Sequence, residues 1–187
     1  MRKKSHISLA RYLVAKSGSA ELKKHRLAFY LGSILPDCKL SFIYRRHEIG
    51  ATFEDVKKEM IRLAEEEKAQ KNRRAYYRNL GQVSHYIADY FTFPHNAVYP
   101  GTLSDHCSYE ELLKRRLREY LTDGEADSNR QPPENFDNVR ELAAYILEEH
   151  RKYLQKKLGI EEDIRDIVRI NCQMMSGMMH FSMAGAV

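Results

Sequence analysis

Residues 73–92, RRAYYRNLGQVSHYIADYFT, are the stretch of sequence that decides the fold. Tyrosine, leucine, valine and isoleucine occur on nearly every face of the helix that this stretch predicts, so the helix should lie inside a domain. His85 and Asp89 are four positions apart and share one face, one turn above the other. Gly81, one turn earlier, lets another part of the chain approach closely. An ionised carboxylate in such a setting requires a cation or several hydrogen-bond donors.

Helical periodicity continues on both sides of this stretch. Phe53, Val56, Met60 and Leu63 recur at helical spacing with charged residues between them. The pattern predicts helices over 6–16, 20–35, 53–71, 73–92, 107–121, 137–157 and 161–183, with Thr52 as the N-cap of the third. No segment alternates with a period of two, so strands are not expected. The prediction is an all-α chain, one compact multi-helix domain of about seven helices over 1–187, with 122–136 as a mobile polar connector.

Composition excludes several classes of protein. A hydrophobic share of 43% and a charged share of 30% are typical of a soluble globular chain rather than a disordered one. No apolar run is long enough to span a bilayer, so stable membrane insertion is not expected. Three cysteines without a CxxC motif argue against a disulfide framework, and no secretory signal precedes the first helix, so a cytoplasmic location is expected. The net charge of +5 leans mildly towards anionic partners.

Metal-ligating residue types gather in the middle of the sequence. His95 follows Asp89 by six positions, and His106 and Glu110 repeat the four-residue spacing of His85 and Asp89. A single such pair is more often a structural hydrogen bond, but two pairs with another histidine between them are typical of a zinc site on helices. Imidazole and carboxylate ligands suit a borderline ion such as Zn²⁺.

Three histidines outside this set have simpler interpretations. His25 lies beside a basic stretch and should be solvated, and His150 follows two glutamates and should lie at a helix rim. His180, among methionine and phenylalanine residues, should be a core histidine with its hydrogen bonds satisfied.

Three motifs resemble those of a known family. The run GQVSHYIADYFTFPHN at 81–96, followed by DHCSYE at 105–110 and preceded by LGSILPD at 31–37, resembles the core of the zinc-dependent phospholipase C family, relatives of the S1/P1 nucleases. The resemblance covers about residues 1–115. It implies an all-helical domain that holds two or three zinc ions and hydrolyses phosphate esters with a metal-activated water.

The resemblance also implies a ligand set for each ion. The first ion would be held by Asp37, His47, His85 and Asp89. The second would be held by His95, His106 and Glu110. The third would be held by the amino and carbonyl groups of Met1, by His6 and by Asp89.

Further roles follow from the same resemblance. Asp37 would also serve as the catalytic general base, and Tyr44 would form one wall of a substrate pocket. The expected function is a phospholipase C-like phosphodiesterase acting on a phospholipid headgroup or a nucleotide-like ester. Three alternatives stay open: an S1/P1-like nuclease or nucleotidase, a non-enzymatic helical zinc-binding protein, and a basic helical nucleic-acid binder.

Overall fold

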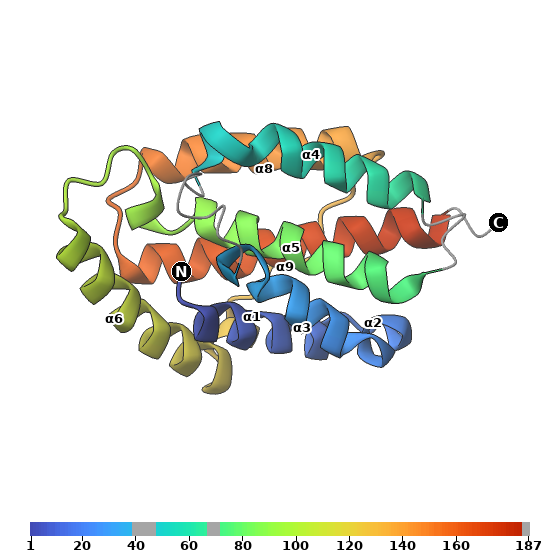
Figure 1. Ribbon diagram of the computed structural model, residues 1–187, viewed down its shortest axis with the longest axis horizontal. Coiled ribbons are helices and arrows are strands. Elements are labelled where there is room, and N and C mark those ends of the chain that lie inside the picture. The colour runs from blue at the N-terminus through green and yellow to red at the C-terminus, as the bar shows by residue number, and fades with distance from the viewer. Residues whose placement is uncertain (39–47, 67–71, 185–187) are drawn as a thin grey trace.

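Helices stacked in three layers make up the computed structural model (Figure 1), which describes residues 1–38, 48–66 and 72–184. The elements are α1 (Lys3–Lys16), α2 (Ala20–Lys24), α3 (Arg26–Ile34), the 3₁₀ turn η1 (Pro36–Cys38), α4 (Ile49–Glu66), α5 (Arg73–Tyr90), the 3₁₀ turn η3 (Phe93–His95), α6 (Leu103–Thr122), α7 (Glu125–Ser128), α8 (Val139–Leu154) and α9 (Ile160–Ala184). The described ranges contain no strand, which confirms the all-α prediction.

Helices α5 and α9 form the middle layer of the stack. Helices α4 and α8 cover one side of this layer, α1 and α3 cover the other, and α6 runs obliquely across one end (Figure 1). Because α5 has neighbours on both sides, its apolar residues are buried around the whole helix, as the sequence predicted. Asn72 begins α5, since its side chain accepts a hydrogen bond from the backbone N–H of Ala75.

Two glycines bring α3 and α5 into direct backbone contact. A Cβ atom at Gly81 would lie 2.3 Å from the carbonyl oxygen of Phe29, and one at Gly32 would lie 1.8 Å from that of Arg78. The close approach predicted at Gly81 is therefore confirmed. Because α3 leads directly into η1, this contact also sets where Asp37 lies relative to α5.

The helices number nine in the described ranges rather than about seven. The expected helix 20–35 is interrupted at His25, whose ψ of 16° departs from the α conformation and separates α2 from α3. The second helix that was not predicted is α7, which lies inside the connector 122–136. The buried side chains of Ala126 and Phe136 anchor that connector to the core; its mobility stays a prediction.

The prediction that Thr52 caps the third long helix was wrong. Helix α4 begins at Ile49, and the Thr52 hydroxyl donates to the carbonyl of Glu48 from within the first turn. The same hydroxyl lies 2.9 Å from the hydroxyl of Tyr90 and so connects α4 to α5. Residues 67–71 of the expected helix lie outside the described residues.

Three histidines differ from their predicted surroundings. His150 is buried rather than at a rim, and His180 is exposed rather than in the core. His25 is largely covered, with its ring stacked on that of Tyr77 at 5.3 Å. In each case the neighbours in the fold, and not those in the sequence, decide the burial.

Candidate metal centre

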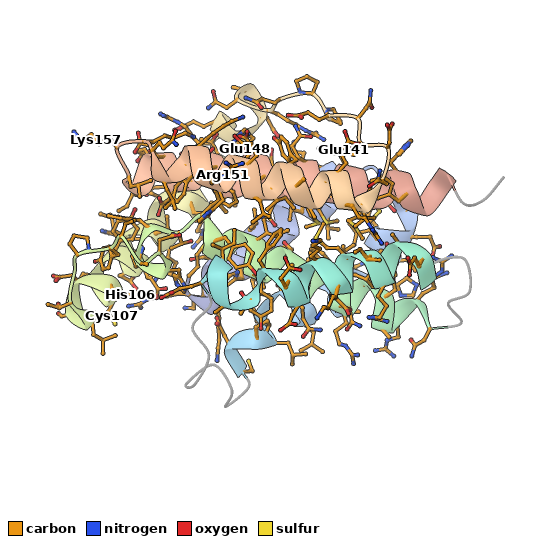
Figure 2. All side chains as sticks on the ribbon, turned by 90° about the horizontal axis from the view of Figure 1, so that it is seen from above. His106, Cys107, Glu141, Glu148, Arg151 and Lys157 are labelled. Atoms are coloured by element: carbon orange, nitrogen blue, oxygen red, sulfur yellow. The ribbon has the colours of Figure 1, made fainter. Side chains whose placement is uncertain are left out.

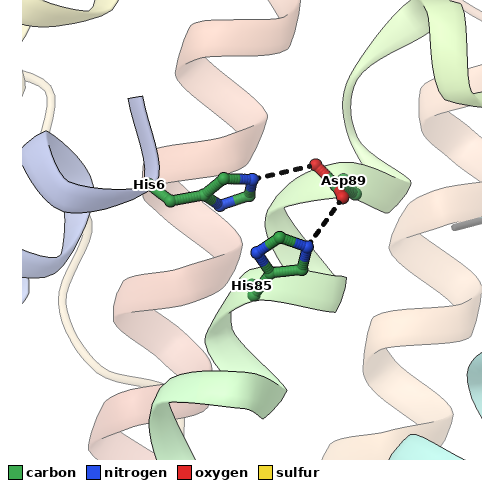
Figure 3. A group of neighbouring side chains, drawn as sticks. All are labelled: His6, His85 and Asp89. Carbon is green, nitrogen blue, oxygen red and sulfur yellow. Dashed lines mark ion pairs between the residues drawn. The ribbon is translucent and has the colours of Figure 1, made fainter. Parts of the chain in front are cut away.

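A first group of possible ligands joins α1 to α5 in the interior (Figure 3). His6 Nε2 lies 3.3 Å from Asp89 Oδ1, and His85 Nε2 lies 3.2 Å from Asp89 Oδ2. All three side chains are buried, and their ligand atoms lie within 4.8 Å of one another. Two donors bound at roughly 2.1 Å to a tetrahedral ion stand about 3.4 Å apart, so the spacing of these atoms suits one ion.

The orientation of His85 is fixed by the backbone of α3. Its Nδ1 lies 2.9 Å from the carbonyl oxygen of Ser33, which can only accept a hydrogen bond. Nδ1 therefore carries the proton, and Nε2 presents its lone pair towards Asp89. The His6 and His85 rings also stack, with centroids 3.9 Å apart.

Asp37 reaches the first group from η1. Its Oδ1 lies 3.5 Å from His85 Nε2, and its side chain is 18% exposed, whereas that of Asp89 is fully buried. Asp37 is thus the carboxylate of this group nearest to solvent. His47, expected as a fourth ligand, and Tyr44, expected as a pocket wall, lie outside the described residues.

A second group consists of His95, His106 and Glu110. The Nε2 atoms of His95 and His106 each lie 3.1 Å from Glu110 Oε1. Thr102 and Asp105 form a capping box that begins α6 and thereby places His106 and Glu110 one turn apart near its start. Figure 2 shows His106 at the outer edge of the molecule, at the end that α6 forms, and its side chain is 27% exposed.

The amino group of Met1 lies between the two groups. Its nitrogen is 2.6 Å from Asp89 Oδ1, 2.8 Å from His95 Nε2 and 3.1 Å from Glu110 Oε1. Burial lowers the pKa of this amine, whereas the charges of Asp89 and Glu110 raise it. The two carboxylates outweigh burial, so the pKa lies above its ordinary value. As a metal ligand the amine would release its proton.

The electrostatics of the two groups favour neutral side chains at His6 and His95 and charged side chains at Asp89 and Glu110. Burial lowers the pKa of His6 to about 3, and burial also lowers the pKa of His95. Burial alone would raise the pKa of Asp89, yet the Met1 ammonium and the nearby histidines hold it well below its ordinary range. Burial likewise opposes the hydrogen bonds from His106 and His95 that hold the pKa of Glu110 below its ordinary value. These are the protonation states that metal binding requires.

One buried atom indicates that a group absent from the protein chain belongs here. Among the described residues, His6 Nε2 is buried and makes no hydrogen bond of good geometry, although Asp89 Oδ1 lies 3.3 Å away. Buried polar atoms are rarely left so. Imidazoles that face a shared carboxylate form a donor set suited to Zn²⁺. The residues present therefore fit a metal.

The structure brings together seven of the eight predicted ligands. The Met1 amine lies between the two groups, against Asp89 of the first and Glu110 of the second. Sequence reasoning missed the Ser33 carbonyl that orients His85. No side-chain pattern could have indicated it, because a backbone oxygen is present at every residue.

The fold and the site define a class of protein: a helical domain with two groups of imidazole and carboxylate side chains that could bind metal ions. The chain matches the family model described as "Zinc dependent phospholipase C" over residues 5–160, and it belongs to this family. The match extends beyond the 1–115 of the predicted resemblance and includes every proposed ligand except Met1. No curated protein and no solved structure matches the chain.

Membership of the family implies a dependence on zinc and a phosphate ester as substrate. In the part of the chain that the structure describes, no helix combines the length and the apolar character needed to cross a bilayer.

Proposed function

We propose that the chain is a zinc-dependent hydrolase that cleaves a phosphodiester in a phospholipase C-like reaction. The observation that supports this most strongly is the convergence of α1, α5 and α6 on two adjacent ligand groups. A structural zinc site closes around one ion, whereas adjacent groups that share a carboxylate are typical of hydrolases with several metal ions.

Asp89 would help to hold two ions. Its Oδ1 faces the Met1 amine and His6, and its Oδ2 faces His85, so each oxygen serves a different set of donors. His85 and Asp37 would hold the first ion, together with His47. Met1 and His6 would hold the third, and His95, His106 and Glu110 the second.

When bound, the zinc ions would supply an activated water and Lewis-acid stabilisation of the phosphoryl oxygens. The chain contributes the remaining steps. Asp37 is proposed as the general base, because it is a carboxylate of the first group that solvent reaches. The second group lies closer to the surface than the first and would receive the phosphate. Burial of His6 and Asp89 keeps bulk water away from these two side chains and keeps the His6 imidazole neutral.

The test is hydrolysis of bis(p-nitrophenyl) phosphate by the zinc-loaded chain. Asp37→Asn should lower kcat by about 100-fold or more, as expected for loss of a general base. Asp137→Asn, at an exposed position before α8, is the matched control and should leave kcat unchanged. Zinc content is measured on the same samples, because Asp37 is also a proposed ligand. Equal rates for Asp37→Asn and the control would contradict the proposal.

A second candidate is an S1/P1-like nuclease, favoured by one aromatic ring beside each group. The Tyr86 ring lies 5.5 Å from that of His85, and the Tyr99 ring lies 6.3 Å from that of His106. Partly exposed rings can stack on nucleobases. Release of a phosphorylated headgroup from phosphatidylcholine micelles would favour the first candidate, and cleavage of a single-stranded oligonucleotide would favour the second.

A further inference from the structure

A fully buried carboxylate outside both ligand groups, Asp163, lies in the first turn of α9. Three elements donate hydrogen bonds to it. The backbone N–H of Phe93 donates to Oδ2 at 2.7 Å, and the hydroxyl of Tyr109 donates to the same oxygen at 2.8 Å. The hydroxyl of Tyr153 donates to Oδ1 at 2.7 Å. Burial raises the pKa of this carboxyl group to about 7, and the three hydrogen bonds oppose that shift. A carboxylate buried in this way is stable only where such donors surround it.

Two of the three donors are neighbours of proposed ligands. Phe93 begins η3, which ends at His95, and Tyr109 directly precedes Glu110 on α6. Because both donors share Oδ2, this one oxygen sets the separation between the start of η3 and the first turns of α6. The separation of those two segments in turn decides how His95 meets Glu110, now at 3.1 Å.

The third donor serves as an internal comparison. Tyr153 belongs to α8, an element that carries none of the proposed ligands. Its hydroxyl bonds to the same carboxylate as that of Tyr109, and at nearly the same distance. Loss of either hydroxyl therefore removes one hydrogen bond from the same buried carboxylate. Only the Tyr109 hydroxyl belongs to a residue next to a proposed ligand.

We propose that Asp163 is a positioning residue for the second ligand group: through Oδ2 it holds His95 and Glu110 in the arrangement that binds an ion. This inference rests on the proposed function, since it assigns an ion to that group. Partners that orient metal ligands commonly change metal affinity by about 10- to 100-fold when they are removed.

The experiment compares Tyr109→Phe with Tyr153→Phe in the full chain. Each variant loses one hydroxyl and keeps its ring, so both should unfold at lower temperature than the unsubstituted chain. Zinc is titrated in competition with a chromophoric chelator, which gives stepwise affinities, and His106→Ala identifies the step that belongs to the second group. Tyr109→Phe should weaken that step about 10-fold, and Tyr153→Phe should change it less than about 2-fold. Asp163→Asn should weaken it at least as much as Tyr109→Phe.

Each result bears on the inference. Equal zinc affinities of Tyr109→Phe and Tyr153→Phe, with zinc bound normally by the unsubstituted chain, would overturn the inference alone. If the unsubstituted chain binds no zinc, the proposed function fails and the inference fails with it. The phenylalanine variants keep the test informative even if Asp163→Asn does not fold.

Discussion

His150 is a buried imidazole with a role separate from metal binding. Its Nε2 lies 2.8 Å from Asn96 Oδ1, and the Asn96 amide nitrogen donates to the carbonyls of Tyr90 and Thr92. His150 therefore donates from Nε2 and supports the turn that carries His95. Burial lowers the pKa of His150 to about 4, and a hydrogen bond to the Tyr90 backbone opposes this shift. The ring is neutral in the folded protein at neutral pH.

This buried histidine predicts a pH dependence of stability. Because the pKa is lower in the folded than in the unfolded chain, the unfolded chain binds the proton first as the pH falls. The contribution of His150 to the free energy of unfolding should fall by about 3 kcal/mol as the pH is lowered from 6.5 to 4. It should change no further below pH 4. His150→Gln keeps a donor for Asn96 without the titration.

Urea unfolding of both metal-free proteins at pH 7 and pH 4 checks this prediction. The variant should gain about 3 kcal/mol relative to the unsubstituted chain on acidification. Other titrating groups are common to both proteins and cancel in the difference. A difference that stays constant with pH would show that His150 does not titrate as described.

At the scale of elements, the contact between α3 and α5 controls the first ligand group. The contact places the Ser33 carbonyl against His85 and leads the chain into η1, where Asp37 faces the same imidazole. Gly32 and Gly81 permit it, because each presents no Cβ to the opposing backbone.

Gly32→Ala should therefore be strongly destabilising. The added Cβ would lie 1.8 Å from a backbone oxygen that cannot rotate away, so α3 must move. We expect a loss of about 3 kcal/mol in the free energy of unfolding, measured in urea, together with weaker zinc binding. Gly50→Ala in α4 is the control, since no atom lies within 4 Å of its Cβ position. Its stability should be unchanged or raised by less than about 1 kcal/mol. Equal changes in the free energy of unfolding for the two substitutions would contradict the close packing of α3 against α5.

Spacing within one helix was the part of the site that the sequence could predict. His85 and Asp89 on α5, and His106 and Glu110 on α6, meet because four residues make about one turn. His6 is a different case, because its approach to Asp89 depends on how α1 packs. Only the resemblance to a family indicated it in advance.

Local periodicity also explains the errors. Leu22 and Phe29 keep one apolar face across the break at His25, so the pattern does not reveal that the helix is interrupted. The glutamates before His150 suggested exposure, but Glu149 is itself buried in ion pairs with Lys152 and Arg169. Charge in the sequence does not exclude burial when partners arrive from another helix.

At the scale of the whole molecule, the two ligand groups join segments that are distant in the sequence. The N-terminal segment, α5 and the start of α6 all meet at the end of the stack that α6 covers (Figure 1). Ions bound there cross-link these segments in the folded chain and have no equivalent site in the unfolded chain. Binding should thus contribute to folding stability.

Metal removal should accordingly lower the thermal stability. Each ion present at 100 times its dissociation constant adds about 2.7 kcal/mol, which for a chain of this size raises Tm by about 5–10 °C. Calorimetry with zinc and after chelation measures the effect, and Mg²⁺ serves as the control ion that imidazole ligands bind poorly. A Tm that is the same with zinc and after chelation would argue against bound ions.

The most direct test of the central claim is the zinc content of the purified chain, measured by mass spectrometry after dialysis, with and without Asp89→Ala. We predict two or more zinc ions per unsubstituted chain, and at least one fewer in the variant, because Asp89 contacts donors of both groups. A chain that binds no zinc, or an Asp89→Ala variant with an undiminished zinc content, would contradict the account.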